Sequence, residues 1–269
     1  TKQVQNLSNE QIEAVNRFRD ELETDLNRFN ENRLAAYIRL ANDISMPAQQ
    51  KLALAISGWL LGSNNAIENL AVVQSMFVVR DFVREYLDEA TTAQRRTSIL
   101  KELAILESGT PKILDAMIQQ MKPIETAANV ESYTGESAIE FTVEVPGTAA
   151  NPEPIQFRCM AHLPPQYNPY RKYPMIISLT GGTQSLDQNM EIWYGKYNQK
   201  LKIRQGNAPR NGYIVVTVDW RVPGQTRWNH SGREHRVVLD ALYRSLRLFS
   251  VDSDRVFLSG HREGGDGAY

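Results

Sequence analysis

Residues 255–265, RVFLSGHREGG, join a short apolar strand to a glycine-flanked turn. Gly260 and Gly264 lie two positions to either side of Arg262. We expect these glycines to remove Cβ atoms that would clash with the neighbouring strand and the following helix, and we expect Arg262 to adopt a positive φ. A side chain held in this way projects above the sheet, beside the backbone N–H of the next residue, Glu263. The stretch therefore predicts a functional site at the end of a sheet strand.

The residues before this turn predict an α/β sheet. Segments 139–145 and 155–161 alternate between apolar and polar residues, as strands with one exposed face do, whereas 173–179 and 213–219 are nearly continuous apolar runs, typical of strands covered on both faces. An amphipathic helix is expected over 232–249, and a turn over 252–254 leads into the last strand. The expected order is two antiparallel strands, then strand, helix, strand, helix and strand, with right-handed crossovers.

The first half of the chain has helical periodicity instead. Ser8 begins a capping box, and the apolar spacing with its breakers predicts six helices, over 12–29, 34–44, 47–62, 66–88, 91–106 and 111–122. We expect an all-α accessory domain at 1–128 and an α/β domain at 129–269. The helical part contains no histidine and no cysteine, and its carboxylates are scattered along polar faces. It therefore offers no reactive constellation.

Composition excludes several classes of protein. The net charge is −1, divided as −3 over residues 1–128 and +2 over 129–269, so we expect no nucleic-acid partner. No apolar run reaches the length of a membrane span, and the single cysteine, Cys159, excludes an internal disulfide. No zinc spacing, phosphate loop or dinucleotide fingerprint is present, so we expect no metal and no cofactor. The compartment is left open.

Residues from about 136 to 269 resemble the first half of an α/β-hydrolase, and LSGHREGGDG at 258–267 resembles its nucleophile elbow. The resemblance extends to esterases and prolyl-oligopeptidase-like peptidases, including the polyhydroxyalkanoate-depolymerase type. It implies acyl transfer to water from a small ester or a peptide, with position 262 as the nucleophile. The oxyanion would be held by the N–H of Glu263 and by Gly181 or Gly182, in the TGGT loop at 180–183. The implied substrate-contact candidates are Thr183, Trp220 and His261.

Two departures from the family pattern matter. Position 262 is arginine rather than serine, and a guanidinium is always protonated and cannot act as an acyl-transfer nucleophile. The acid and histidine of the family's triad follow the elbow, on loops that would lie beyond Tyr269. We therefore expect this chain to be catalytically inactive, as a truncated α/β-hydrolase sheet preceded by an all-α domain. Strand 255–259 would be an exposed edge, and we expect a second chain or a C-terminal segment to complete the sheet.

Three hypotheses for the function remain open. The first is an incomplete or inactivated serine hydrolase. The second is a pseudo-hydrolase in which Arg262 helps to bind a small anionic ligand or a protein partner. The third places the function in the helical half, as a scaffold or dimerisation module.

Overall fold

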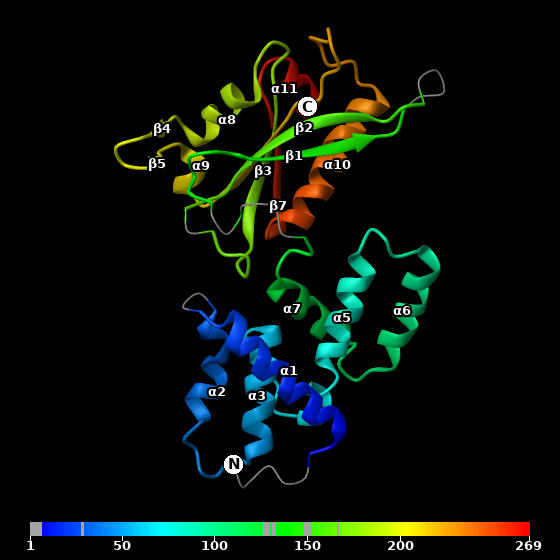
Figure 1. The fold of residues 1–269 in the computed structure, drawn as a ribbon, viewed down its shortest axis with the longest axis vertical. Helices are drawn as coiled ribbons and strands as arrows, with labels where there is room; N and C mark the ends of the chain where they lie inside the picture. Colours follow the sequence, from blue (N-terminus) through cyan, green and yellow to red (C-terminus); the bar gives the residue numbers. More distant parts are fainter. Residues whose placement is uncertain (1–6, 28–29, 126–129, 131–132, 148–151, 166) are drawn as a thin grey trace. The chain divides into compact units, whose positions relative to one another are not determined.

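The computed structural model describes residues 7–27, 30–125, 130, 133–147, 152–165 and 167–269. The chain divides into two compact units, Thr1–Ile124 and Glu125–Tyr269. The boundary expected at 128/129 lies among residues 126–129, outside the described residues. The helical unit comes first along the chain, and the unit with the sheet follows it (Figure 1).

The helical unit is built around one buried helix, α3 (Ala48–Leu61), in which every residue from Ala53 to Leu61 is buried. Because this helix is covered on all sides, the buried polar groups around it need hydrogen-bond partners within the protein. Arg33 does part of this, because its guanidinium donates to the carbonyls of Trp59 and Gln120 at 3.1 and 2.7 Å. The surrounding elements are α1 (Asn9–Asp25), η1 (Glu31–Leu34), α2 (Ala35–Leu40), η2 (Ser63–Asn65), α4 (Leu70–Val73), α5 (Met76–Leu87), α6 (Ala93–Ile105) and α7 (Pro111–Gln120).

The predicted helices differ from the observed ones in three places, the first being the helix expected over 12–29, which ends at Asp25. The capping box at Ser8 is confirmed, but the helix expected over 34–44 ends at Leu40. The long helix expected over 66–88 is wrong, because it is divided into α4 and α5 at residues 74–75. Ser75 Oγ hydrogen-bonds to Ser108 Oγ at 2.5 Å and donates weakly to the Val72 carbonyl, so its hydroxyl competes with regular helix hydrogen bonding at the break.

The second unit contains the predicted sheet. Its strands are β1 (Ile139–Val145), β2 (Ile155–His162), β3 (Tyr173–Leu179), β6 (Ile214–Val218) and β7 (Val251–Gly260), in the spatial order β1-β2-β6-β3-β7. The pairs β1–β2 and β2–β6 are antiparallel, whereas β3 pairs in parallel with both β6 and β7. The expected element order is confirmed. Strands β3 and β6 are buried along their whole length, as their continuous apolar sequences predict.

Helices cover both faces of this sheet (Figure 1). Helix α10 (Gly232–Leu248) packs its apolar stripe on one face, through Val237, Ala241 and Leu248. Helices α8 (Leu186–Tyr194) and α9 (Asn207–Arg210) cover the other face. Between them a short hairpin, β4 (Tyr197–Asn198) and β5 (Ile203–Arg204), was not predicted from the mixed polarity of that stretch.

The last strand is longer and less regular than expected. Tyr173 pairs with Val251 and Met175 pairs with Val256, so the turn predicted at 252–254 is a bulge within β7. The Asp252 carboxylate stabilises this bulge by accepting from the Asp254 N–H and from Arg255 Nε. In the described part of the chain β7 pairs only with β3, and Phe257 and Leu258 remain 48% and 44% exposed. The expected exposed edge is therefore observed.

Strand direction decides which segments meet at each end of the sheet. The parallel strands β3, β6 and β7 finish at the same end of the sheet, which brings together residues 180–183, 219–231 and 261–265. Because β2 runs antiparallel to β6, its last residue, His162, lies at the opposite end of the sheet. Charged side chains lie at both ends: Arg262 and Glu263 at the first, and Arg204 at the second.

Candidate functional site

Arg262 occupies the turn between β7 and α11 (Glu263–Ala268) with φ 52° and ψ −119°. We call residues 260–265 the Arg262 turn. This backbone conformation costs an L-residue about 1–2 kcal/mol. Only Lys202 and His230 share a positive φ among the other described non-glycine residues. The prediction that Arg262 is forced into a positive φ is confirmed.

The glycines of the Arg262 turn are required by close backbone packing. A Cβ at Gly260 would lie 1.9 Å from the carbonyl oxygen of Gly264. A Cβ at Gly264 would lie 2.5 and 2.6 Å from the carbonyl oxygens of Leu179 and Thr180, at the end of β3. All three distances are far inside van der Waals contact. The turn therefore packs directly against the loop that follows β3.

That loop meets the Arg262 turn through the side chain of Glu263. Glu263 Oε2 accepts from the Gly182 N–H with an N···O distance of 2.7 Å. This bond, together with the N–H of Glu263 itself, lowers the pKa of the Glu263 carboxyl below its usual value. A carboxylate thus lies at the Gly182 N–H, one of the backbone donors that the resemblance offers for an oxyanion.

Residues 180–183 are held in place by the loop that follows β6. Trp220 Nε1 donates to the Thr180 carbonyl at 2.9 Å, and Arg221 Nη1 donates to the Gly182 carbonyl at 2.8 Å. Arg221 is in turn paired with Asp219 at 2.7 Å. A Cβ at Gly182 would lie 2.0 Å from the Thr226 carbonyl oxygen, so only glycine fits under that loop. The Gly182 N–H is therefore fixed in position before any ligand arrives.

The predicted substrate contacts are placed differently from one another. Thr183 and His261 are exposed beside the Arg262 turn. Trp220, expected to contact a substrate, is 0% exposed and packs edge-on against Trp228, which corrects that prediction. The indole follows a fully buried strand, so its large apolar surface completes the core while its N–H is used on Thr180.

Sequence reasoning missed two groups at this site. It assigned only the backbone of Glu263, whereas the structure uses its carboxylate, and it gave no role to Arg221. The position of Arg221 directly after a buried parallel strand was the available signal. His162 lies at the other end of the sheet, while His230 and His235 are exposed and form no hydrogen bond with the Arg262 turn in the described part of the chain.

The described residues contain neither a metal cluster nor a membrane-spanning helix. Among them no group of three or more His, Cys, Asp or Glu side chains is arranged to hold a metal ion. Within the same residues no helix combines the length and apolar character needed to cross a bilayer.

The spatial order of the five main strands, the two-sided helix cover and the strained residue after β7 together decide the fold. The second unit is a partial α/β-hydrolase fold. We base this assignment on the strand order and on the geometry of the Arg262 turn.

Similarity to known proteins is distant and partial. The chain is 30% identical over 117 residues to a probable dipeptidyl-aminopeptidase B of Aspergillus terreus, covering 43% of this chain and 10% of that protein. The corresponding protein of Talaromyces marneffei is 37% identical over 87 residues, or 32% and 8% of the two chains. Dipeptidyl-peptidase 5 of Porphyromonas gingivalis is 30% identical over 115 residues, or 40% and 16%. The chain thus spans a small part of the curated relatives it matches. No protein-family model matches it.

Solved α/β-hydrolases are similar at a lower level. A thermostable esterase has a TM-score of 0.35 at 17% identity, with 50% of this chain and 36% of that chain covered. An esterase of Pyrobaculum calidifontis has a TM-score of 0.34 at 15% identity, with 64% and 50% covered. Dipeptidyl peptidase 4 of Porphyromonas gingivalis has a TM-score of 0.32 at 17% identity, with 49% and 18% covered.

Proposed function

We propose that the second unit derives from a serine hydrolase that transfers the acyl group of an ester or a peptide to water, and that position 262 is the inherited nucleophile position. The distant dipeptidyl-peptidase relatives support this reaction class. The observation that carries the proposal is the pairing of a strained residue 262 with a carboxylate held at the Gly182 N–H. An oxyanion hole requires donors of this kind, fixed where negative charge develops.

The chain with Arg262 does not complete this reaction. A guanidinium has no lone pair to offer as a nucleophile at any ordinary pH, so no acyl-enzyme forms at position 262. The Glu263 carboxylate also occupies the Gly182 N–H that an oxyanion would need. In this proposal the chain is therefore an inactivated member of its reaction class, with the backbone machinery retained.

A covalent probe tests the proposal. Arg262→Ser in the full-length protein should restore a hydroxyl at the strained position and react with a fluorophosphonate, which forms a stable adduct with activated serines. Arg262→Ala is the control for labelling at any other serine. Labelling of the Ser variant alone, located at residue 262 by tandem mass spectrometry, supports the proposal. Equal labelling of the Ser and Ala variants contradicts it.

A second candidate function is binding of a small anion at the Arg262 turn, without chemistry. Arg262 is exposed and forms no ion pair with a carboxylate among the described residues. A ligand carboxylate or phosphate could pair with this guanidinium. Calorimetric titration with inorganic phosphate tests this candidate. Binding that is lost in Arg262→Ala, but kept in Arg227→Ala on the adjacent loop, would favour it over simple inactivation.

Strand β7 is exposed along its outer edge, where no strand pairs with it in the described part of the chain. We propose that a further strand, from a second chain or from a C-terminal segment, covers Phe257 and Leu258. A soluble, monomeric and cooperatively folding 1–269 product would contradict this. The remaining hypothesis, a helical scaffold, predicts that residues 1–128 fold alone and self-associate in sedimentation.

A further inference from the structure

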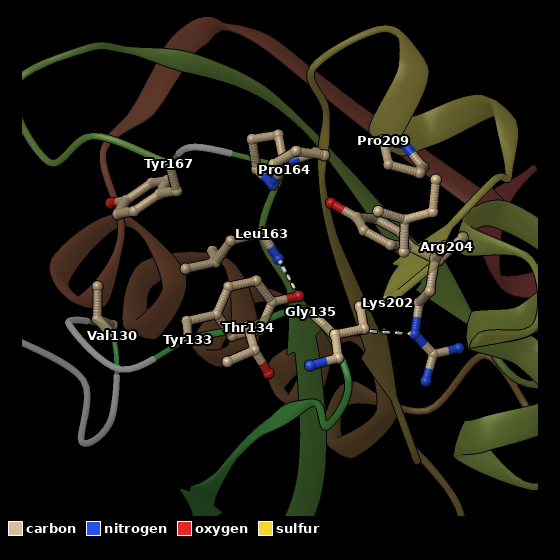
Figure 2. Close-up of a pocket in the computed structure, with 13 residues that line it drawn as sticks. Val130, Tyr133, Thr134, Gly135, Leu163, Pro164, Tyr167, Lys202, Arg204 and Pro209 are labelled. Carbon is tan, nitrogen blue, oxygen red and sulfur yellow. Dashed lines mark hydrogen bonds between the residues drawn. The ribbon is translucent and has the colours of Figure 1, made fainter. Parts of the chain in front are cut away.

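A hollow of about 250 Å³ lies at the end of the sheet opposite the Arg262 turn (Figure 2). The segment after β2, the stretch before β1 and the hairpin β4–β5 contribute its walls. Because β2 is antiparallel to β6, this hollow lies beyond the starts of the parallel strands rather than their ends. It is therefore separate from the Arg262 turn. Its volume suits a ligand smaller than the drug-sized molecules of ordinary pockets.

The walls of the hollow offer ring faces rather than hydroxyl groups. Three tyrosines contribute, and the structure already uses the hydroxyl of each: Tyr133 is bonded to His162 Nδ1 and the Leu163 N–H, Tyr167 accepts from the Ser250 N–H, and Tyr194 donates to the Tyr213 carbonyl. Figure 2 shows the bond between the Tyr133 hydroxyl and the Leu163 N–H, both in the lining of the hollow. Proline rings and aliphatic side chains supply more of the lining. The walls thus favour a flat apolar body.

Among the described residues, the only charged side chains that line the hollow are cations, Lys202 and Arg204. Neither forms an ion pair with a carboxylate in that part of the chain. Arg204 donates from Nε, Nη1 and Nη2 to the carbonyls of Gly135, Gly195 and Glu136, and these bonds fix the guanidinium. They leave its positive charge without a neighbouring carboxylate, and two of its five N–H groups without an acceptor, among the described residues. Lys202 forms no side-chain hydrogen bond with the described residues, and its backbone has φ 53°.

His162, the residue before the lining residue Leu163, is affected by the positive charge of Arg204. His162 is buried and stacked on Tyr194 with ring centroids 4.9 Å apart. Burial first, and then the charge of Arg204, lower its pKa to about 3, so the imidazole is neutral, and its Nδ1 is hydrogen-bonded to the Tyr133 hydroxyl. His162 therefore adds no charge to the hollow, and no carboxylate of the described residues lines the hollow to repel an anion.

We propose that this hollow binds a small aromatic carboxylate, with its ring against the tyrosine and proline side chains and its carboxylate toward Lys202 and Arg204. The ring fits the lining, and the anion supplies the charge that the two cations lack. Neutral aromatic compounds of the same size gain the first interaction only. The site is independent of position 262 and of any hydrolytic activity.

Calorimetric titration with sodium benzoate, at low ionic strength and pH 7, tests the proposal, with benzamide as the neutral analogue. Benzoate should bind at least tenfold more tightly than benzamide. Lys202→Asn removes one cation at a backbone position that asparagine accepts, and should weaken benzoate binding about fivefold without changing benzamide binding. Lys200→Asn, an exposed lysine outside the lining, is the matched control and should have no effect. Equal affinity for the two ligands, no binding of benzoate, or equal effects of the two lysine variants would overturn the proposal.

Discussion

The two ends of the sheet use charged side chains in opposite ways. At the Arg262 turn a carboxylate, Glu263, accepts from a backbone N–H, whereas at the other end a guanidinium, Arg204, donates to three backbone carbonyls. The Glu263 contact is a single hydrogen bond to one backbone N–H. The Arg204 contacts tie together separate segments of the chain. The Glu263 carboxylate is therefore held at one point, whereas the Arg204 guanidinium holds a wall of the hollow in place.

The largest effect should come from the backbone packing of the Arg262 turn. Gly264→Ala places a methyl group 2.5 Å from a carbonyl oxygen of β3, so the turn must move away from the sheet, at a cost of about 3 kcal/mol or more in the free energy of unfolding. Gly265→Ala is the matched control, since its Cβ would meet nothing closer than 3.7 Å and alanine is the better helix former. Urea denaturation of the two variants measures the difference. Similar stabilities would show that the close packing at Gly264 is absent.

The next largest effect comes from His162, at the end of the sheet opposite the Arg262 turn, and concerns how stability depends on pH. The pKa of His162 is lowered to about 3, below its ordinary value near 6.5, so the unfolded state binds the extra proton first. Stability should therefore be complete above pH 6.5 and fall toward pH 3, with a slope of up to about 1.4 kcal/mol per pH unit from this group.

His162→Phe keeps a ring to stack on Tyr194 but cannot titrate. It should lose stability at pH 7, because the Tyr133 hydroxyl loses its hydrogen-bond partner on His162, and it should flatten the pH profile between 6.5 and 4. His235→Gln, at an exposed histidine, should leave the profile unchanged. Thermal unfolding as a function of pH measures these profiles. Equal profiles for the parent, His162→Phe and His235→Gln would show that His162 is accessible to protons in the folded protein.

A somewhat smaller loss is expected when Arg204 is replaced. Arg204→Lys keeps the charge, but a single ammonium group cannot reach three carbonyls on two segments of the chain, so we expect a loss of about 2 kcal/mol in the free energy of unfolding. Arg210→Lys, at the exposed end of α9, should change stability by less than about 0.5 kcal/mol. If Arg204→Lys leaves the free energy of unfolding unchanged, the carbonyl contacts contribute no more than surface hydrogen bonds do. The contrast between the two ends of the sheet would then be wrong.

The smallest effect on stability belongs to Glu263. Its pKa is lowered by the Gly182 N–H and by its own N–H, so its contribution is present above the ordinary carboxyl pKa and is lost as pH falls through the lowered value. Glu263→Gln should therefore be slightly less stable than the parent at pH 7 and equally stable in acid, below the lowered pKa of Glu263. Asp266→Asn, a change to an exposed carboxylate in the same helix, should show no such convergence.

The sequence predicts the local features of the fold well and the contacts between distant residues poorly. Strands β1 and β3 have the predicted bounds, because strict alternation and a continuous apolar run are local signals. The positive φ of Arg262 was predictable from Gly260 and Gly264 for the same reason. The break at Ser75 depends on Ser108, far along the chain, and the sequence pattern of 66–88 contains no sign of it.

The functional site shows the same limit. The loop 180–183 and the Arg262 turn were paired correctly from motif order, but the Glu263 carboxylate reaches Gly182 only because two strand ends meet at one sheet edge. Trp220 was predicted to contact a substrate, and only the packing of Trp228 against it shows that it is buried.

The amide proton of Gly182, followed by NMR as a function of pH, reports on the Glu263 contact itself. We predict a downfield resonance at pH 7, from the charged hydrogen bond to Glu263, that moves upfield as the Glu263 carboxyl is protonated. In Glu263→Gln the same resonance should lie upfield already at pH 7 and should not titrate. A Gly182 resonance that is the same in both proteins, and insensitive to pH, would contradict the claim that the Glu263 carboxylate is held at the Gly182 N–H beside position 262.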